Sequence, residues 1–330
     1  MPELKDWNLV ADIGGTNARF ALHDSHSDEL KDITVLSVAD HSNFLIALHH
    51  AISNLTLSNQ WKAKPEAVCL AVACPVDQDL IRFTNSHWTF SKTELSISLG
   101  NIPLDVINDF SAIAYSITAL KDNDWLQLGS GQAKPEKPIA ILGPGTGLGM
   151  CTLVPYDKGF MVLDGEGGHS DFAPASKQEV AILQELKKRF QRVSVERLLS
   201  GDGIVNIYQA LCKLETSEIV HTTARDISAA AMQKMDELAV ETLSVFCRIL
   251  GTTAGNLALM TGARGGVYIA GGIPPKIVDF IAHSECRARF EDKGRFSSYV
   301  TDIPLRILLK KQPGLDGAMQ KVKFNQLQFK

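Results

Sequence analysis

Two short glycine-rich turns hold the residues best suited to bind a phosphate group. Each turn lies between two apolar stretches that predict a pair of strands, and the turns are residues 14–16 (GGT) and 145–147 (GTG). Glycines allow close approach of the backbone and leave successive N–H groups free to face an anion, while threonine adds a hydroxyl donor. A Gly-Gly turn alone is more often an ordinary hairpin, so the second copy is what favours phosphate binding.

One carboxylate accompanies the first turn. Asp12 comes just before it, and Mg²⁺ prefers few carboxylates together with waters and phosphate oxygens. The sequence therefore predicts that Asp12 holds the Mg²⁺ of a nucleotide through a water molecule. A third glycine pair, Gly271-Gly272, follows an apolar strand, and we expect it to present a flat surface to an adenosine ring or ribose.

Asn108 and Asp109 end a predicted strand and precede a predicted helix at residues 110–120. Taken alone, an aspartate at this position is more often a helix N-cap. With a phosphate-binding turn in the same chain, Asp109 becomes a candidate general base that takes the proton from an attacking hydroxyl. Such a base contributes about 10²–10⁴-fold, while positioning and Mg²⁺ supply most of the acceleration of phosphoryl transfer.

Three more residues could bind polar ligands, but their surroundings also allow simpler interpretations. Glu166 and His169 lie in a glycine-rich loop, where an isolated E-x-x-H is more often a metal pair or a surface loop. Glu196 follows Ser194 at a predicted helix start, where an acidic residue offsets the helix dipole. The residues alone leave these alternatives open.

The composition of the chain limits its class. With 330 residues, 45% of them hydrophobic and 21% charged, it predicts a globular protein of about two domains. The net charge of −4 and the lack of a Lys/Arg cluster argue against nucleic acid as a partner. No apolar run approaches the roughly 18 residues of a membrane span, and residues 1–6 lack the features of a signal peptide, so we expect a cytoplasmic protein. The six scattered cysteines predict buried free thiols in place of disulfides or a zinc site.

The order of the predicted elements is that of an α/β protein. Strands alternate with helices, and the two glycine hairpins, about 130 residues apart, predict a duplicated architecture around one ligand. Residues 226–260 are predicted to be helical with a break near Gly251, and a loop at 128–138 marks a domain boundary. The chain contains neither G-x-x-x-x-G-K-[ST] nor G-x-G-x-x-G, which disfavours a P-loop protein and a dinucleotide fold.

Six motifs taken together resemble those of the bacterial ATP-dependent glucokinases, a family of the sugar kinase, actin and heat-shock chaperone ATPase superfamily. They are DIGGTNAR at 12–19, INDF at 107–110, GPGTGLG at 143–149, GEGGHSDFAP at 165–174, ERLLSG at 196–201 and AGG at 270–272. The resemblance covers nearly the whole chain, through FEDKGRF at 290–296 to PGL at 313–315. It implies a two-domain, duplicated ribonuclease H-like fold of the actin-like ATPase type with a central cleft.

The resemblance also implies roles for the candidate residues. It implies transfer of the γ-phosphoryl group of MgATP to the 6-hydroxyl of glucose, with Asp109 as the base. The glucose-binding residues that it implies are Asn108, Asp109, Glu166, His169 and Glu196. Those that it implies for ATP are Asp12, Ile13, Gly14, Gly15, Thr16, Asn17, Gly145, Thr146, Gly147, Gly271 and Gly272.

Boundary signals predict how the domains are made up. We expect a small domain at residues 1–119, completed by the C-terminal helix at 312–330, and a large domain at 120–311. Hinges near 110–120 and 310–313 would let the domains close on the sugar and exclude water. The resemblance further implies a homodimer formed through helices of the large domain.

The chain departs from the ROK group of sugar kinases and repressors within the same superfamily. No cysteine follows His169 before Cys212, so no structural zinc is expected, and no helix-turn-helix segment precedes the first strand. Three alternatives remain beside a glucokinase. They are a kinase for mannose, fructose or N-acetylglucosamine, an actin-type ATPase without a sugar substrate, and a sugar-sensing protein without catalysis.

Overall fold

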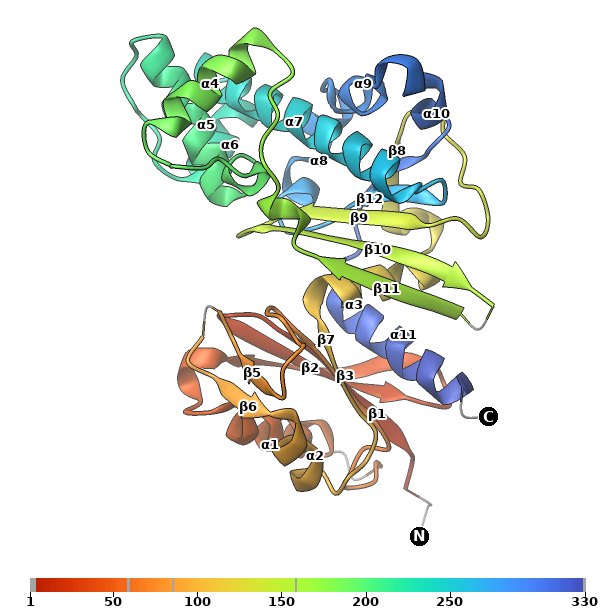
Figure 1. The fold of residues 1–330 in the computed structure, drawn as a ribbon. Coiled ribbons are helices and arrows are strands. Elements are labelled where there is room, and N and C mark those ends of the chain that lie inside the picture. The colour runs from red at the N-terminus through yellow and green to blue at the C-terminus, as the bar shows by residue number, and fades with distance from the viewer. Residues whose placement is uncertain (1–3, 58–59, 85, 158, 329–330) are drawn as a thin grey trace. The chain divides into compact units, whose positions relative to one another are not determined.

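The computed structural model describes residues 4–57, 60–84, 86–157 and 159–328, in which helices and strands alternate (Figure 1). The chain forms two compact units. Unit 1 comprises Met1–Leu120, Asp157–Val162 and Lys311–Lys330, and unit 2 comprises Lys121–Tyr156 and Leu163–Lys310. Residues 157–162, which the sequence placed in the large domain, are thus part of unit 1.

A five-stranded sheet forms the centre of unit 1. In the order β3-β2-β1-β4-β7, its strands are Glu29–Ser37, Asn17–Asp24, Trp7–Ile13, Val68–Val72 and Leu104–Asn108. β1 pairs with β2, and β2 with β3, in antiparallel fashion, whereas β1, β4 and β7 run parallel. The carboxyl ends of the three parallel strands therefore share one edge of the sheet.

Both faces of this sheet are covered, which explains why β1 is a nearly continuous apolar run. Trp7 and Leu9 pack in the same cluster as Phe44 on one face, and Val10 packs with Leu315 on the other. The helices of unit 1 are α1 (Phe44–Leu55), α2 (Lys92–Ser98), α3 (Asp109–Ser116) and α11 (Pro313–Gln328), and β5 (Leu80–Arg82) pairs with β6 (Thr89–Ser91).

Unit 2 is built on a six-stranded sheet, of which only the first part of the edge strand β11 (Gly159–Gly165), up to residue 162, is assigned to unit 1. In the order β11-β10-β9-β12-β13-β8, its strands are Gly159–Gly165, Leu148–Tyr156, Ile139–Pro144, Gly266–Ile269, Leu305–Leu308 and Trp125–Leu128. β9 pairs antiparallel with β10, while β9, β12 and β13 run parallel and β8 is antiparallel to β13. The helices of this unit are α4 (Lys177–Lys187), α5 (Gly201–Leu214), α6 (Ala224–Met232), α7 (Glu237–Thr261), α8 (Val278–Ala282), α9 (Cys286–Glu291) and α10 (Ser297–Thr301).

The two sheets repeat one strand order. In each, a hairpin of two antiparallel strands carries a glycine turn, and the first strand of that hairpin pairs in parallel with a strand from later in the chain. This repeat confirms the predicted duplicated α/β fold. Short 3₁₀ helices connect the elements, at Val38–Asp40 (η1), Ile117–Ala119 (η2), Asp122–Asp124 (η3), Gly167–His169 (η4), Val195–Arg197 (η5), Pro274–Ile277 (η6) and Gly294–Phe296 (η7).

Side-chain caps fix where many of the helices begin. Polar side chains accept a hydrogen bond from a backbone N–H of the first turn in α1, α2, α4, α5, α6 and α7, and these caps are Asn43, Ser91, Ser176, Ser200, Thr223 and Asp236. A cap of this kind contributes about 1 kcal/mol because it satisfies a donor that the helix leaves unpaired.

The predicted break near Gly251 is wrong. α7 runs through Gly251 without interruption, and the actual break lies between Met232 and Glu237. A β-carbon on Gly251 would lie 2.0 Å from the carbonyl oxygen of Cys286, and one on Gly255 would lie 2.4 Å from that of Phe290. The glycines therefore allow the backbone of α9 to approach α7, which local sequence does not reveal.

α7 is also long and apolar enough to cross a membrane by length and composition alone, contrary to the sequence expectation. Its most apolar window is, however, 61% buried inside the protein, as in the core helix of a globular unit. The six cysteines agree with the prediction for them, since all are buried free thiols.

Candidate active site

The first glycine turn connects β1 and β2 in unit 1. Its backbone closes through a hydrogen bond from the Gly14 N–H to the Asn17 carbonyl at 3.0 Å, and Val38 N–H donates to the Thr16 carbonyl at 2.9 Å. The side chains of Thr16 and Asn17 are exposed. A β-carbon on Gly14 would make only an ordinary contact of 3.6 Å with Asn17 O, so the expected steric need for glycine in this turn does not hold at Gly14.

Asp12 precedes this turn with a partly buried carboxylate. Its side chain is 27% exposed, and its Oδ2 lies 3.9 Å from Nη1 of Arg19. Burial raises the pKa of Asp12, and the charge of Arg19 offsets only part of that rise. A carboxylate that is partly buried and only loosely paired fits the ligand set of Mg²⁺, which combines one or two carboxylates with waters and phosphate oxygens.

Asn108, not Asp109, caps helix α3. The Oδ1 of Asn108 accepts a hydrogen bond from Phe110 N–H at 2.9 Å, and its Nδ2 donates to the Cys74 carbonyl at 3.4 Å. Asp109 is the first residue of the helix, and its Oδ1 also accepts from Phe110 N–H at 2.9 Å. The amide oxygen of Asn108 and a carboxylate oxygen of Asp109 thus share one donor, which keeps both side chains at the start of α3.

Strand register brings Asp109 and Asp12 to the same edge of the sheet in unit 1. Asp12 pairs with Ala71 on β4, and Ala71 pairs with Ile107 on β7, two residues before Asp109. Cys74 lies there as well, and burial, followed by the charge of Asp109, raises the pKa of its thiol to about 11. In α/β sheets this carboxyl edge is where ligands bind.

In unit 2 the second glycine turn and the third glycine pair lie together. The Gly145 N–H donates to the Gly147 carbonyl at 2.8 Å, and Ile273 N–H donates to the Pro144 carbonyl at 3.2 Å. Gly271 has a φ of 88°, and a β-carbon there would lie 2.5 Å from Pro144 O, so only glycine fits. A β-carbon on Gly145 would lie 3.8 Å from Gly272 N, while one on Gly272 would meet nothing within 4 Å. The backbone is therefore closely packed at Gly271 and open at Gly272.

Glu166 comes directly before η4, a 3₁₀ helix where the sequence predicted only a loop, and His169 is the last residue of that helix. His169 Nε2 lies 4.0 Å from Glu166 Oε2, and the two side chains are 58% and 78% exposed. Among the described residues, no group of three or more His, Cys, Asp or Glu side chains could hold a metal ion. Both side chains can therefore bind a ligand from solvent.

Glu196 makes a contact that sequence reasoning missed. It lies in η5, and its Oε2 accepts a hydrogen bond from the N–H of Leu148, directly after the second glycine turn, at 2.8 Å. The dipole role expected for an acidic residue at a helix start is thus accompanied by a direct link to the glycine turn. Since the two residues are 48 positions apart, no local motif could have signalled this bond.

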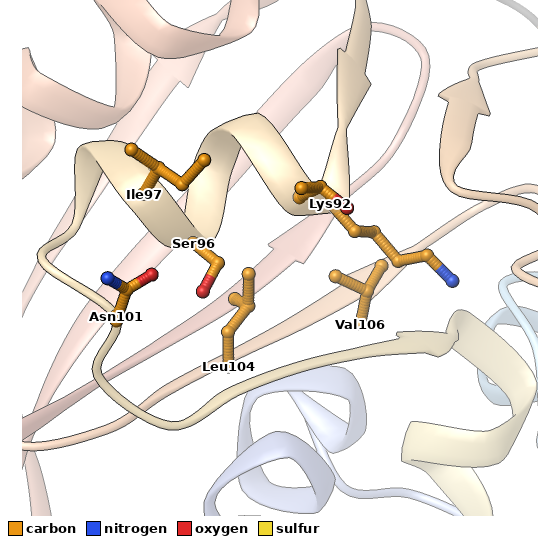
Figure 2. A pocket seen from close by; sticks show the side chains of 7 residues that line it. Lys92, Ser96, Ile97, Asn101, Leu104 and Val106 are labelled. Atoms are coloured by element: carbon orange, nitrogen blue, oxygen red, sulfur yellow. The ribbon is translucent and has the colours of Figure 1, made fainter.

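A separate pocket of about 340 Å³ lies between α2 and β7 of unit 1 (Figure 2). Figure 2 shows the side chains of Leu104 and Val106 extending from β7 toward the helix. The lining residues are Lys92, Thr93, Ser96, Ile97, Asn101, Leu104 and Val106, and they include none of the predicted site residues. The pocket shares β7 with Asn108 but is not the predicted active site.

Comparison with known proteins identifies the family. The sequence model of the glucokinase family matches residues 9–324. The chain belongs to the glucokinase family. It is 42% identical over 315 residues to a glucokinase of Hahella chejuensis, covering 96% of each chain. This membership makes the chain an ATP-dependent hexose kinase.

Solved structures agree with this membership. A crystal structure of glucokinase from an Antarctic psychrotroph has a TM-score of 0.87 at 36% identity, with 96% of this chain and 99% of that chain covered. A ROK hexokinase from Thermus thermophilus has a TM-score of 0.66 at 18% identity, with 96% and 97% covered. The latter likeness is one of fold alone, and it shows that this two-domain architecture is shared across sugar kinases.

Proposed function

We propose that this chain transfers the γ-phosphoryl group of MgATP to the 6-hydroxyl of glucose, with Asp109 as the general base. The observation that carries the proposal is that Asp12, beside the first glycine turn, and Asp109, at the start of α3, lie at one edge of the same sheet. A carboxylate at that edge can take the proton from a hydroxyl whose oxygen attacks a phosphorus bound at the turn. The products are glucose 6-phosphate and ADP.

Five side chains would bind the hydroxyls of glucose. They are Asn108 and Asp109 of unit 1 and Glu166, His169 and Glu196 of unit 2. Carboxylates accept hydrogen bonds from hydroxyls, and an imidazole can donate or accept. A site built on such bonds rejects analogues that lack a hydroxyl, because its own polar groups are then left unpaired. Asn108 contributes the second hydrogen of its amide, since its Oδ1 is engaged with Phe110.

The glycine motifs would bind ATP. The turns at 14–16 and 145–147 would offer threonine hydroxyls and backbone N–H groups to the phosphates, apart from the N–H groups of Gly14 and Gly145, which bond within the turns. The pair Gly271-Gly272, which is open at Gly272, would face the adenosine. Asp12 would hold Mg²⁺ through a water molecule. The Mg²⁺ would neutralise the negative charge that develops on the phosphate oxygens.

Several finer assignments extend this proposal. The stretch from His169 to Cys212 lacks cysteine, which supports a glucokinase outside the ROK group and without zinc. We propose functional domains of residues 1–119 with 312–330 and of residues 120–311, which close on the sugar. We also propose a cytoplasmic homodimer joined through helices of the large domain. Light scattering coupled to size-exclusion chromatography measures the mass of the proposed dimer. Crystal structures with and without the sugar show whether one domain rotates relative to the other.

A sugar panel tests the proposed reaction. ADP release is coupled to a spectrophotometric assay with glucose, mannose, fructose and N-acetylglucosamine, each over a range of concentrations. Glucose should give the highest kcat/KM. A higher value for another hexose would assign that hexose as the substrate, and ATP turnover without sugar or filament formation would favour an actin-type ATPase.

A further inference from the structure

The side chain of Glu196 lies against the second glycine turn. Its Oε2 accepts the N–H of Leu148 at 2.8 Å, and a β-carbon on Gly147 would lie only 2.6 Å from the same oxygen. Gly147 has no positive φ that would require glycine. The lack of a side chain at residue 147 therefore serves to leave room for the Glu196 carboxylate.

The backbone of Glu196 is linked to the same turn by a second route. Its carbonyl accepts a hydrogen bond from Ser200 Oγ at 2.8 Å, and Ser200 caps α5 through the Gly203 N–H at 3.0 Å. Gly201, the first residue of α5, donates its N–H to the Gly145 carbonyl at 2.9 Å. Glu196 is thus held to the turn at residues 145–148 by its side chain and through the start of α5.

The segment that carries Glu166 and His169 packs on the same residues. A β-carbon on Gly168 would lie 2.2 Å from the carbonyl oxygen of Leu148, and the N–H of Val195 donates to the Ser170 carbonyl at 2.9 Å. Leu148 therefore contacts both proposed sugar-binding segments, through its N–H and its carbonyl. These contacts all lie within unit 2.

One oxygen of the Glu196 carboxylate remains available. Within the described part of the chain, Oε2 has the Leu148 N–H as its partner, and no hydrogen bond engages Oε1. A carboxylate offers about four acceptor positions on its two oxygens. The group can therefore bind a sugar hydroxyl and the turn at the same time.

We propose that Glu196 couples sugar binding to nucleotide binding, with Oε2 holding the Leu148 amide and Oε1 accepting a hydroxyl of glucose. The inference rests on the proposed function, because it assigns glucose and ATP to this site. A bound sugar fixes the rotamer of Glu196, and the turn that binds phosphate is then held in one conformation before the nucleotide arrives. When either ligand is bound, the turn is already ordered, so the other ligand binds with a smaller loss of conformational entropy.

Coupling of this kind is reciprocal and can be measured. A nucleotide that strengthens glucose binding by a given factor is itself bound more tightly by that factor when glucose is present. We expect a factor of about tenfold, within the usual range for coupled sites. The measurement is isothermal titration of glucose with and without saturating Mg²⁺ and a non-hydrolysable ATP analogue, repeated with the order of ligands reversed.

Gly147→Ala is the decisive variant. Its methyl group displaces the Glu196 carboxylate from Leu148 without replacing any of the side chains proposed to bind the sugar, so the coupling factor should fall to within about twofold of one. Gly165→Ala is the matched control, because a β-carbon there meets nothing within 4 Å, and it should keep the wild-type factor. Glu166→Gln should weaken glucose binding but also keep the factor, since Glu166 is exposed and forms its pair with His169.

A second variant covers the case in which Gly147→Ala does not fold. Glu196→Asp keeps the charge but is one methylene too short to reach the turn and the sugar together, so it should also lower the factor at least threefold. An unchanged factor in either folded variant overturns the proposal, as does a wild-type protein that binds both ligands without coupling. A wild-type protein that binds no glucose overturns the proposed function instead.

Discussion

Gly314, near the start of α11, lies against the carboxylate of Asp12. A β-carbon on Gly314 would lie 2.7 Å from Cγ and 2.8 Å from Oδ2 of Asp12. Both residues belong to unit 1, although they come from opposite ends of the chain. The first turn of α11 therefore fixes where the carboxylate that we assign to Mg²⁺ can lie.

Gly314→Ala should displace that carboxylate and impair use of MgATP. We expect kcat to fall about tenfold, because misplacement of a binding group by about 1 Å can cost as much as 100-fold. The Mg²⁺ concentration needed for half-maximal activity should rise as well, while KM for glucose stays near the wild-type value. Steady-state kinetics with Mg²⁺ varied at fixed ATP checks this, and an unchanged Mg²⁺ requirement would show that Asp12 does not serve the metal.

Asp109→Ala should abolish turnover while glucose binding largely survives. Loss of a general base costs about 10²–10⁴-fold in kcat, whereas the other proposed sugar contacts remain. Asp109→Asn is the matched variant, since its amide oxygen can still accept the Phe110 N–H that Asp109 now accepts. Both variants are compared by kcat and by glucose titration. More than a tenth of wild-type kcat in Asp109→Asn would exclude Asp109 as the base and favour a sugar-binding role alone.

The parts of the fold that sequence predicted are those governed by local pattern. The two glycine hairpins, the parallel strands and their repetition follow from apolar runs and turn residues, so the duplicated α/β fold was predictable. The helix break was misplaced because Gly251 serves a contact with α9, and a distant backbone leaves no mark on the local pattern. Asn108 caps α3 in place of Asp109, a choice between two neighbouring acceptors that propensity does not decide.

The sequence predicted which residues form the candidate site, but not the contacts that hold their side chains in place. Motifs and resemblance supplied the carboxylates and glycines, because each stands in a recognisable short segment. The contacts that hold them come from elsewhere in the chain: Glu196 to Leu148, and Gly314 to Asp12. Such pairs depend on how the elements pack, so a single sequence could not indicate them.

Gly317→Ala should destabilise the protein and weaken catalysis together. A β-carbon on Gly317 would lie 1.6 Å from the carbonyl oxygen of Ala112, so α11 and α3 would have to separate. We expect a loss of about 3 kcal/mol in the free energy of unfolding, the upper part of the usual range for overpacking. kcat should also fall, because α3 begins at Asp109.

Gly201→Ala is the matched control for this prediction. A β-carbon there would lie 3.7 Å from the nearest atom, the Gly145 carbonyl oxygen, and alanine favours helices by up to about 1 kcal/mol over glycine. Its stability should equal or exceed that of the wild type in urea unfolding. If Gly317→Ala were as stable as Gly201→Ala, the close crossing of α3 and α11 would be disproved.

Asp24→Asn should destabilise the protein in a pH-dependent way. Burial opposes ionisation of Asp24, but hydrogen bonds from the His26 N–H, from Lys31 and from the hydroxyl and N–H of Ser27 outweigh it and hold the pKa well below its usual range. Since the pKa is lower in the folded state, the ionised group stabilises the fold above its unfolded pKa of about 4. That contribution disappears as the pH falls through the folded pKa.

The variant should therefore lose about 2 kcal/mol of unfolding free energy at neutral pH, the usual cost of weakened hydrogen bonds to a buried charge. The loss of unfolding free energy should stay constant between about pH 8 and pH 5, where Asp24 is ionised in both the folded and the unfolded state. It should become smaller below about pH 4. Urea unfolding of wild type and variant at several pH values measures the difference.

Asp32→Asn is the matched control, because Asp32 is exposed and has a φ of 50° that asparagine also adopts. It should change stability by less than about 0.5 kcal/mol. A loss in Asp24→Asn that stayed the same at pH 3.5 would mean that the effect comes from packing and not from the charge.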